Sequence, residues 1–501
     1  MTTDVGRPDA ATRFTVINPA TRDPVGEHPV AGADDVAGAV ARAREAQRWW
    51  QELGFGGRKP YLVNWIRRLA QDCDRIYEIG FGETARPRAD VQFELFAGLE
   101  DLRWAGAHAR RVLRPRRVAP GLAMANFDAR LSYQPYGVIG VITPWNAPVY
   151  LTLTSAGAAL AAGNAVVVKP SELSPASAIA VLEAFGRANP DAPPGLVSWV
   201  TGLGETGAAL CTSGVDKLAF TGSVPTGRRV MAACAGRLTP VVLELGGKDA
   251  TIVAGDADLA AAATGVIWGS LFNGGQACVG VERVYVVRSV RDAFLKELRQ
   301  KATGIDVGTG ALAAYGPMTV DQQIEIVRRH VGDALEHGAG ALVGGLDSIR
   351  PPYIDPIVLL DVPEDRPAVR EETFGPVVVV NTVEDVQEAV RRANSTDFGL
   401  GSSVYSARQG PAIAGRLRAG GTTINSVLSF VGMSSMPFGG VGQSGFGRFH
   451  GDDGLREFAY PKSTVRRRFG LGPEMQVFPR TPEQFSSVRK TLRLRYGRTF
   501  R

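Results

Sequence analysis

Residues 138–169 read VIGVITPWNAPVYLTLTSAGAALAAGNAVVVK, which is an apolar run, a turn, a helical stretch and a second apolar run. The runs at 138–142 and 165–168 are almost continuously apolar, as strands buried on both faces of a sheet are. Residues 151–162 lie between them and have the length of a crossover helix. Because a strand, a helix and a strand form the unit of a parallel sheet, this stretch predicts a doubly wound α/β domain.

The same alternation continues on both sides of this stretch. Further strands are expected at 196–200, 217–220, 284–287 and 377–380, and further helices at 34–53, 61–84 and 176–189. The strands at 284–287 and 377–380 belong to a second alternating block over residues 250–425. Because a chain of 501 residues is longer than a domain with a single hydrophobic core usually is, at least two domains are expected.

The charge of the chain is concentrated at its end. Residues 466–501 hold ten Lys or Arg and two Glu, a net +8, so the formal +6 of the whole chain leaves −2 on the first 465 residues. A nearly neutral body argues against a nucleic-acid partner, whose binding surface would be basic. Four cysteines without a CxxC pair, and no visible signal peptide or long apolar run, predict a cytoplasmic protein.

Cys278 is the first candidate for chemistry. It ends the run FNGGQAC (272–278), and 34 residues earlier Glu244 stands in LELGGK (243–248). Glycines let the backbone approach closely, and a thiol with a separate carboxylate is a nucleophile with its base. The histidines offer no comparable centre. His330 and His337 lack acidic or Cys partners at ligand spacing, so no metal site is expected and both are interpreted as surface residues.

Polar groups follow several strand ends, where open α/β sheets bind ligands. Asn146 can donate to an oxyanion or only shape a turn, and Lys169 with Glu172 can hold a ribose or form an exposed charged turn. Glu372 can bind a sugar hydroxyl while Phe374 lies beside a planar ring. Alternatively, both residues only form the turn that leads into a strand.

Two glycine-rich segments are candidates for a pyrophosphate site. GLGETG (202–207) matches G-x-G-x-x-G, a weak signal in a chain with 60 glycines. FTGSVPTG (220–227) ends a strand and opens a helix, so that Ser223 and the first amides of the helix can bind phosphate, and it is preferred.

Seven segments in this order resemble the aldehyde dehydrogenase superfamily, and they cover most of the chain from about residue 18 to 460. They are PWN (144–146), KPSE (169–172), FTGS (220–223), ELGGK (244–248), GQAC (275–278), ETFGP (372–376) and PFGG (437–440). The resemblance implies an α/β fold with an NAD-binding and a catalytic domain, each with a mainly parallel sheet, and a small bridging element for oligomerisation. The expected boundaries are 1–118 with 138–246, then 247–455, and 119–137 with 456–501, the last including the basic tail.

The resemblance also assigns roles to matching residues. Cys278 would attack the aldehyde to give a thiohemiacetal and then a thioester, Asn146 would hold the oxyanion with the Cys278 N–H, and Glu244 would activate the hydrolytic water. The implied cofactor residues are Trp145, Lys169, Glu172, Gly222, Ser223, Gly227, Leu245, Glu372 and Phe374. A carboxylate at Glu172 would repel a 2′-phosphate, which favours NAD over NADP while leaving NADP open.

Four positions depart from many relatives. Ser155 and Phe449 replace a Lys–Glu proton relay, and Thr154 and Phe272 replace arginines of succinate-semialdehyde enzymes. An uncharged aliphatic or aromatic aldehyde is therefore the expected substrate, with a semialdehyde as the alternative. The Phe-His-Gly at 449–451 resembles a branch that includes aromatic- and fatty-aldehyde enzymes.

Other interpretations remain open at this point. A Cys–Glu esterase or thioesterase would use the same nucleophile and base without a cofactor, and a non-catalytic scaffold could share the fold. A homodimer or homotetramer is expected. In the tail, Phe485, Val488 and Leu492 share a helical face beside basic residues, which favours subunit packing over contact with anionic lipid.

Overall fold

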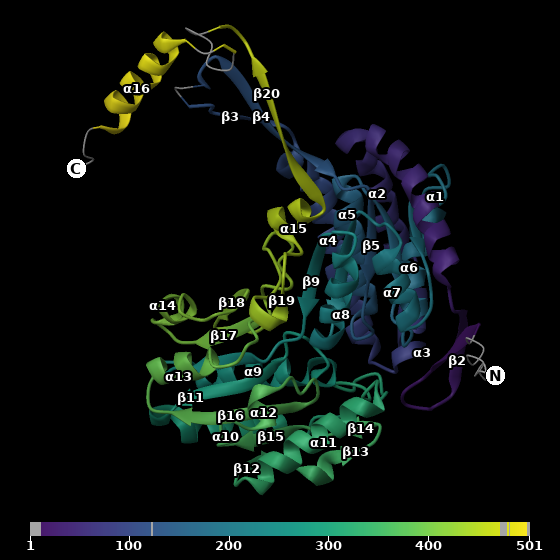
Figure 1. Cartoon of the computed structure of the whole chain (residues 1–501). Coiled ribbons are helices and arrows are strands. Elements are labelled where there is room, and N and C mark those ends of the chain that lie inside the picture. The colour runs from purple at the N-terminus through teal and green to yellow at the C-terminus, as the bar shows by residue number, and fades with distance from the viewer. Residues whose placement is uncertain (1–11, 122–123, 471–477, 480, 498–501) are drawn as a thin grey trace, which may run out of the picture. The chain divides into compact units, whose positions relative to one another are not determined.

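The computed structural model describes residues 12–121, 124–470, 478–479 and 481–497. The chain forms two compact units, one of residues 1–112 and 135–460 and the other of residues 113–134 and 461–501. No helix of the described residues is long and apolar enough to cross a membrane. Figure 1 shows the order of the elements along the chain.

A six-stranded sheet lies in the first half of the larger unit. Its strand order is β19-β9-β8-β5-β6-β7, and every pairing is parallel except that of β19 with β9. The strands are β5 (Val138–Ile142), β6 (Ala165–Lys169), β7 (Val197–Trp199), β8 (Lys217–Gly222), β9 (Val241–Leu245) and β19 (Gly445–Phe446). The parallel α/β sheet predicted from residues 138–169 is thereby confirmed.

Eight helices accompany this sheet. They are α1 (Ala33–Glu52), α2 (Gly54–Gln71), α3 (Cys73–Thr84), α4 (Arg88–Leu113), α5 (Pro148–Ala162), α6 (Pro175–Ala188), α7 (Gly204–Thr212) and α8 (Val224–Ala235). Every residue of α5 is buried, as expected for a helix that is apolar all round.

The single helix expected at 61–84 is wrong, because the structure divides this stretch between α2 and α3. The backbone leaves helical geometry at Asp72, with φ −89° and ψ 8°. The Asp72 carboxylate accepts hydrogen bonds from Arg68 (2.9 Å) and Arg187 (2.7 Å). A short polar side chain of this kind favours helix ends over helix interiors.

A seven-stranded sheet forms the other half of the larger unit. Its order is β12-β15-β16-β11-β10-β17-β18, with only β12 and β15 antiparallel. The strands are β10 (Asp249–Val253), β11 (Val281–Val287), β12 (Gly340–Val343), β15 (Ile357–Leu360), β16 (Val377–Val383), β17 (Gly401–Tyr405) and β18 (Gly421–Ile424). The helices of this part are α9 (Leu259–Leu271), α10 (Arg291–Ala302), α11 (Asp321–Glu336), α12 (Pro367–Arg370), α13 (Val386–Ala393) and α14 (Gly410–Ala414). Helix α15 (Gly451–Glu457) instead contacts α5 beside the six-stranded sheet.

Helices cover both faces of the seven-stranded sheet, as alternation along β11 shows. Val284 and Val286 belong to the core cluster that contains residues of α9 and α10. Tyr285 belongs to a separate cluster that contains Ala389 and Val390 of α13. Successive strand residues point to opposite faces, so a strand with two buried faces must be apolar throughout.

The remaining elements are smaller. Two hairpins of the larger unit pair β1 (Arg13–Ile17) with β2 (Pro24–Pro29) and β13 (Ile349–Arg350) with β14 (Tyr353–Ile354). The smaller unit contains a three-stranded sheet, β20 (Ala459–Arg467), β4 (Phe127–Pro135) and β3 (Arg116–Val118), and the helix α16 (Pro482–Tyr496). The division into NAD-binding, catalytic and oligomerisation parts stays a prediction.

Candidate functional site

The candidate site lies where the carboxyl ends of three parallel strands meet. Asn146 follows β5, Ser223 follows β8, and Glu244 is the penultimate residue of β9. Because β5, β8 and β9 run in the same direction, these residues share one edge of the six-stranded sheet. Segments that precede β11 and β16 of the other sheet add Cys278, Glu372 and Phe374.

The loop that carries Cys278 has a backbone that few sequences adopt. Helix α9 gives way to a 3₁₀ turn at Phe272–Gly275, in which Asn273, Gly274 and Gly275 all have positive φ, at 55°, 63° and 72°. A Cβ at Gly275 would collide with the carbonyl of Gly375. The paired glycines are therefore required for the left-handed turn and for its close contact with the segment before β16.

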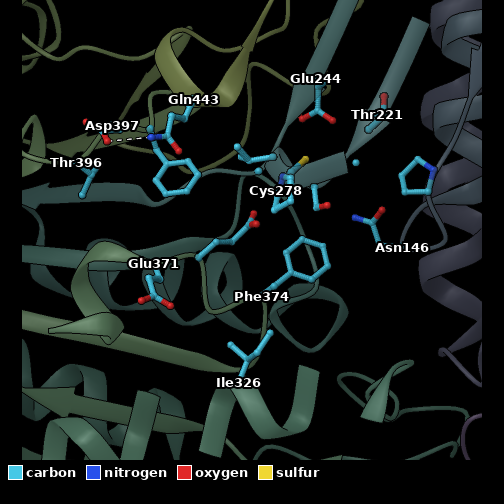
Figure 2. Close-up of a pocket in the computed structure, with 18 of the residues that line it drawn as sticks. Asn146, Thr221, Glu244, Cys278, Ile326, Glu371, Phe374, Thr396, Asp397 and Gln443 are labelled. Atoms are coloured by element: carbon cyan, nitrogen blue, oxygen red, sulfur yellow. Dashed lines mark hydrogen bonds between the residues drawn. The ribbon is translucent and has the colours of Figure 1, made fainter. Parts of the chain in front are cut away.

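Asn146 is held against this loop by hydrogen bonds. Its side-chain amide donates to the carbonyl of Gln276 (3.0 Å), and the amide of Asn273 donates to the carbonyl of Asn146 (3.0 Å). A carboxamide has two N–H donors, so one donor of Asn146 is left for a ligand. Figure 2 shows Glu244 above Cys278 and Asn146 to its right.

Glu244 and Cys278 form a buried acid and thiol pair. Glu244 is 1% exposed, and neither of its carboxylate oxygens has a hydrogen-bond partner of good geometry among the described residues. Burial raises the pKa of Glu244 to about 7, and the neighbouring Cys278 thiol offsets part of that rise. Burial and the negative charge of Glu244 raise the pKa of Cys278 well above its usual value, so the thiol is protonated at rest.

A cavity of about 730 Å³ extends from Cys278 to the first turn of α8. It is lined by Trp145, Gly222, Ser223, Glu372 and Phe374, five of the residues predicted to bind the cofactor. The rings of Trp145 and Phe374 pack edge to face, with their centroids 5.8 Å apart. The cavity thus joins the thiol to the start of a helix, where backbone amides bind anions.

Several lining residues were not predicted. They are Arg228, Gln323, Ile326, Arg370, Glu371, residues 395–398 and Gln443. Gln443 donates a hydrogen bond to Asp397 (2.9 Å), which is drawn in Figure 2. Arg228 could have been predicted, because it lies in the first turns of the helix that follows the FTGS segment. No local sequence pattern marks the other positions.

The other four predicted cofactor residues do not line this cavity. Lys169 and Glu172 form an ion pair with N and O 3.3 Å apart, and the Lys169 amine also donates to the carbonyl of Pro170. Burial lowers the pKa of Lys169, which the charge of Glu172 partly offsets. Gly227 and Leu245 pack directly against each other, and a Cβ at position 227 would come within 2.5 Å of the Leu245 side chain. This glycine lets α8 pack closely on β9.

Ser223 and Glu372 both line the cavity and each accepts a hydrogen bond from a backbone N–H. Ser223 caps α8 by accepting a hydrogen bond from the Thr226 N–H (3.4 Å). Glu372 accepts a hydrogen bond from the Gly247 N–H (3.0 Å), and burial with the charge of Glu282 raises the pKa of Glu372 to about 8. The weak G-x-G-x-x-G segment at 202–207 contributes no lining residue.

A second cavity, of about 310 Å³, meets the first at Asn146 and Cys278. Its walls are apolar, with Phe93, Trp268 and Phe272 in an aromatic cluster whose ring centroids lie 5.3–6.1 Å apart. The charged residues among its described lining are Arg86 and Glu94, which are paired with each other. No free charge therefore faces this cavity from the residues that line it.

The four departures identified in the sequence have clear positions. Phe272 lines the apolar cavity, and the Thr154 hydroxyl donates to the Asp101 carboxylate (2.8 Å). Ser155 is buried in α5, and the Phe449 backbone pairs with that of Phe438. None of these positions supplies a cation to a ligand.

The interpretation of His330 as a surface residue is wrong, whereas His337 is half exposed. His330 is fully buried between Thr373 and Glu371, and burial lowers the pKa of His330 to about 4. It occupies the buried face of the amphipathic helix α11. The described residues contain no group of three or more His, Cys, Asp or Glu that could hold a metal ion.

Comparison with known proteins gives consistent results. Residues 7–464 match the model of the aldehyde dehydrogenase family. The chain is 38% identical over 490 residues to a 4,4′-diapolycopene aldehyde oxidase of a Methylomonas species, covering 97% of this chain and 92% of the relative.

Two solved structures are similar over most of their length. One is a succinate-semialdehyde dehydrogenase from Burkholderia pseudomallei, with a TM-score of 0.85, 33% identity and coverage of 91% of this chain and 94% of that one. The other is an NAD-dependent aldehyde dehydrogenase from Sinorhizobium meliloti, with a TM-score of 0.86, 32% identity and coverage of 93% of each chain.

Proposed function

Because the chain belongs to the aldehyde dehydrogenase family, we propose that it oxidises an uncharged aldehyde to the carboxylic acid at Cys278, with a nicotinamide dinucleotide as oxidant. The observation that carries this proposal is the meeting of two cavities at one thiol. One cavity contains the start of helix α8 and the Glu372 carboxylate, which are groups that can bind a dinucleotide. The other cavity is apolar and suits an uncharged aldehyde.

The residues that line the first cavity suit a dinucleotide in their chemistry. The amides at the start of α8 and the nearby Arg228 suit a pyrophosphate, and the Glu372 carboxylate suits ribose hydroxyls. Phe374 offers a ring face close to Cys278. A bound NAD or NADP supplies the acceptor for the hydride that leaves the aldehyde carbon.

Catalysis starts with transfer of the thiol proton. The Cys278 thiol loses its proton to solvent and the thiolate attacks the aldehyde carbon, while Glu244, with its pKa raised to about 7, stays available as the base for the later hydrolysis. The carbonyl oxygen of the resulting thiohemiacetal becomes an oxyanion, which the free Asn146 N–H and the Cys278 backbone N–H stabilise. Each such donor typically contributes about 3–4 kcal/mol.

Hydrolysis of the thioester completes the cycle. Once the hydride has left, the acyl group remains bonded to the Cys278 sulfur. Glu244 takes a proton from a water molecule that attacks the acyl carbon, and the C–S bond breaks with the Cys278 thiolate as the leaving group. Glu244 then returns the proton to the sulfur as the acid leaves. Because the Lys and Glu of the relay are replaced by Ser155 and Phe449, Glu244 carries this step without that pair.

The experiment that tests the proposal is a substrate panel with purified protein and NAD, followed by NADH absorbance. Hexanal and benzaldehyde are expected to produce NADH with a higher kcat/KM than succinate semialdehyde, because the apolar cavity has no free cation. A preference for succinate semialdehyde would support the second candidate, which the likeness to the Burkholderia enzyme favours. Ester cleavage without any NADH would support a hydrolase and contradict the proposal.

Replacement of Phe272 by alanine should change the use of long apolar aldehydes. Burial of one large apolar side chain contributes about 1.5–3 kcal/mol, so kcat/KM for hexanal is expected to fall roughly 10- to 100-fold, with a smaller loss for acetaldehyde. Phe14→Ala, which removes an aromatic ring outside both cavities, is the control. An equal loss for both aldehydes would show that Phe272 does not select substrates.

The preference for NAD is expected to depend on the charge of Glu172. We infer that this carboxylate lies near the 2′-hydroxyl of the adenosine ribose, held by Lys169. Glu172→Gln removes the repulsion of a 2′-phosphate, so kcat/KM with NADP should rise about tenfold relative to NAD. Glu205→Gln, in the first turn of α7, is the matched control. An unchanged ratio would remove Glu172 from cofactor selection.

The smaller unit is proposed to bind a second copy of the chain. Helix α16 exposes Phe485, Leu492, Leu494 and Tyr496, each more than half exposed. Apolar side chains gathered on one helix favour packing against another protein surface. The oligomeric state, contact of this helix with lipid and a cytoplasmic location stay predictions.

A further inference from the structure

A buried polar cluster lies beside the apolar cavity and has no part in the mechanism above. The Tyr150 hydroxyl lies 2.9 Å from His450 Nε2, and the same nitrogen lies 3.0 Å from the Asp101 carboxylate. Thr154 donates to Asp101 as well (2.8 Å). Tyr150, His450 and Asp101 are each at most 8% exposed, so water does not replace these contacts.

Packing fixes the imidazole ring of His450. Its ring stacks on Phe438, with centroids 5.6 Å apart and an interplanar angle of 26°. Its backbone has φ 57°, and Nδ1 is buried without a hydrogen-bond partner among the described residues. Nε2 is therefore the nitrogen through which His450 acts on its neighbours.

A count of protons shows where the Tyr150 hydroxyl can donate. An imidazole nitrogen has a single hydrogen-bonding site, and two acceptors approach each other at 3.0 Å only with a proton between them. The Nε2–H group of His450 therefore donates its proton to the Asp101 carboxylate. The Tyr150 oxygen can only accept from the same Nε2–H group and cannot donate to it. The remaining partners of the Tyr150 hydroxyl are the Val431 carbonyl at a long 3.4 Å and the hydroxyl of Thr154, whose own proton is donated to Asp101.

The same residue, Tyr150, also borders the site of reaction. Tyr150 lines the apolar cavity together with Asn146 and Cys278, and it lies one turn after Asn146 at the start of α5. Burial, followed by the negative charge of Asp101, raises the pKa of Tyr150 well above its usual value, so the hydroxyl keeps its proton. An uncharged aliphatic aldehyde has one strong hydrogen-bond acceptor, its carbonyl oxygen.

We propose that Tyr150 is a further substrate-contacting residue, whose hydroxyl donates a hydrogen bond to the carbonyl oxygen of the aldehyde, and that His450 and Asp101 are positioning residues for it. The proposal rests on the function proposed above. It assigns a catalytic purpose to the buried His–Asp pair, which lies next to the positions where Ser155 and Phe449 replace the charged relay.

The test is a double-mutant cycle with hexanal, an unsubstituted aldehyde. Tyr150→Phe removes only the oxygen atom and should lower kcat/KM about 10- to 100-fold, as loss of a donor at a reacting oxygen does. Asp101→Asn should lower kcat/KM about fivefold in the wild-type background and less than twofold in the Tyr150→Phe background, because it acts through Tyr150. Tyr405→Phe, at a buried tyrosine of β17 outside both cavities, should leave kcat/KM unchanged.

Two outcomes overturn the inference. One is wild-type kcat/KM in Tyr150→Phe, and the other is an equal effect of Asp101→Asn in both backgrounds, which is the mark of a purely structural pair. Activity of the wild type in the same assay shows that the proposed function stands even if this inference fails. Calorimetric binding of hexanal to Cys278→Ala, with and without Tyr150→Phe, gives a measure independent of turnover: the added change should weaken binding about tenfold.

Discussion

Replacement of Cys278 by alanine is expected to abolish aldehyde oxidation while NAD still binds. The sulfur forms the only covalent bond to the substrate in the proposed mechanism, and no other cysteine lines either cavity. Loss of a nucleophile of this kind typically removes several orders of magnitude of kcat. The measurements are NADH production for turnover and isothermal titration calorimetry for NAD affinity.

A matched control comes from Cys73, a half-buried cysteine at the start of α3 that lines neither cavity. Cys73→Ala should retain wild-type kcat and KM. Residual dehydrogenase activity in Cys278→Ala well above the background rate would remove Cys278 from the role of nucleophile. A simultaneous loss of NAD binding would instead indicate damage to the fold.

Replacement of Glu244 by glutamine is expected to give one rapid turnover of NADH and then a stall. A glutamine at this position cannot accept a proton from water, so the thioester on Cys278 accumulates. Rapid mixing should show a burst close to one NADH per active site, and mass spectrometry should find the acyl group on Cys278. A steady-state rate equal to that of the wild type would mean that another residue is the base. A missing burst would instead show that Glu244 is needed for thiol deprotonation.

The wild-type pH profile follows from the environment of Glu244. Since burial raises its pKa to about 7, the carboxylate that acts as base forms as the pH rises through 7, and deacylation should accelerate over that range and level off above it. The effect on folding has the opposite direction. A carboxyl whose pKa is higher in the folded state binds more protons there, so its contribution to stability falls as the pH rises from the unfolded value of about 4.3 towards 7.

Glu83→Gln is a demanding control for Glu244→Gln. Glu83 is also buried with its pKa raised to about 7, but it lies outside both cavities and accepts hydrogen bonds from the first amides of α6. Its replacement should lower the melting temperature and leave the multiple-turnover rate per folded molecule unchanged. The pair of variants separates loss of a catalytic base from loss of a buried carboxylate.

The strands were predicted more accurately than the helices. Residues 138–142 and 165–168 are almost continuously apolar, as strands buried on both faces of a sheet are. The break at Asp72 was missed because its cause is a contact with Arg187, 115 residues further along the chain. His330 was misplaced for a similar reason: its neighbours Thr373 and Glu371 come from a distant segment.

Within the candidate site, residues that belong to compact local motifs were accessible from the sequence. Trp145, Gly222, Ser223, Glu372 and Phe374 were predicted and line the cavity, because each stands at the end or the beginning of a strand. Gln323, Arg370 and Gln443 were not, because isolated side chains on three separate segments enter the cavity only through the packing of those segments.

The sequence by itself determined the α/β class, the family and the identity of Cys278, Glu244 and Asn146 as candidates, because strand burial and glycine-rich turns leave local patterns of residues. Only the tertiary structure decided that two cavities of different chemistry meet at Cys278, that Arg86 is neutralised by Glu94, and that Tyr150, His450 and Asp101 form one cluster. The last cluster joins residues up to 349 positions apart, since Asp101 and His450 stand at 101 and 450. Contacts of that range depend on how the helices and sheets pack, and no local pattern encodes them.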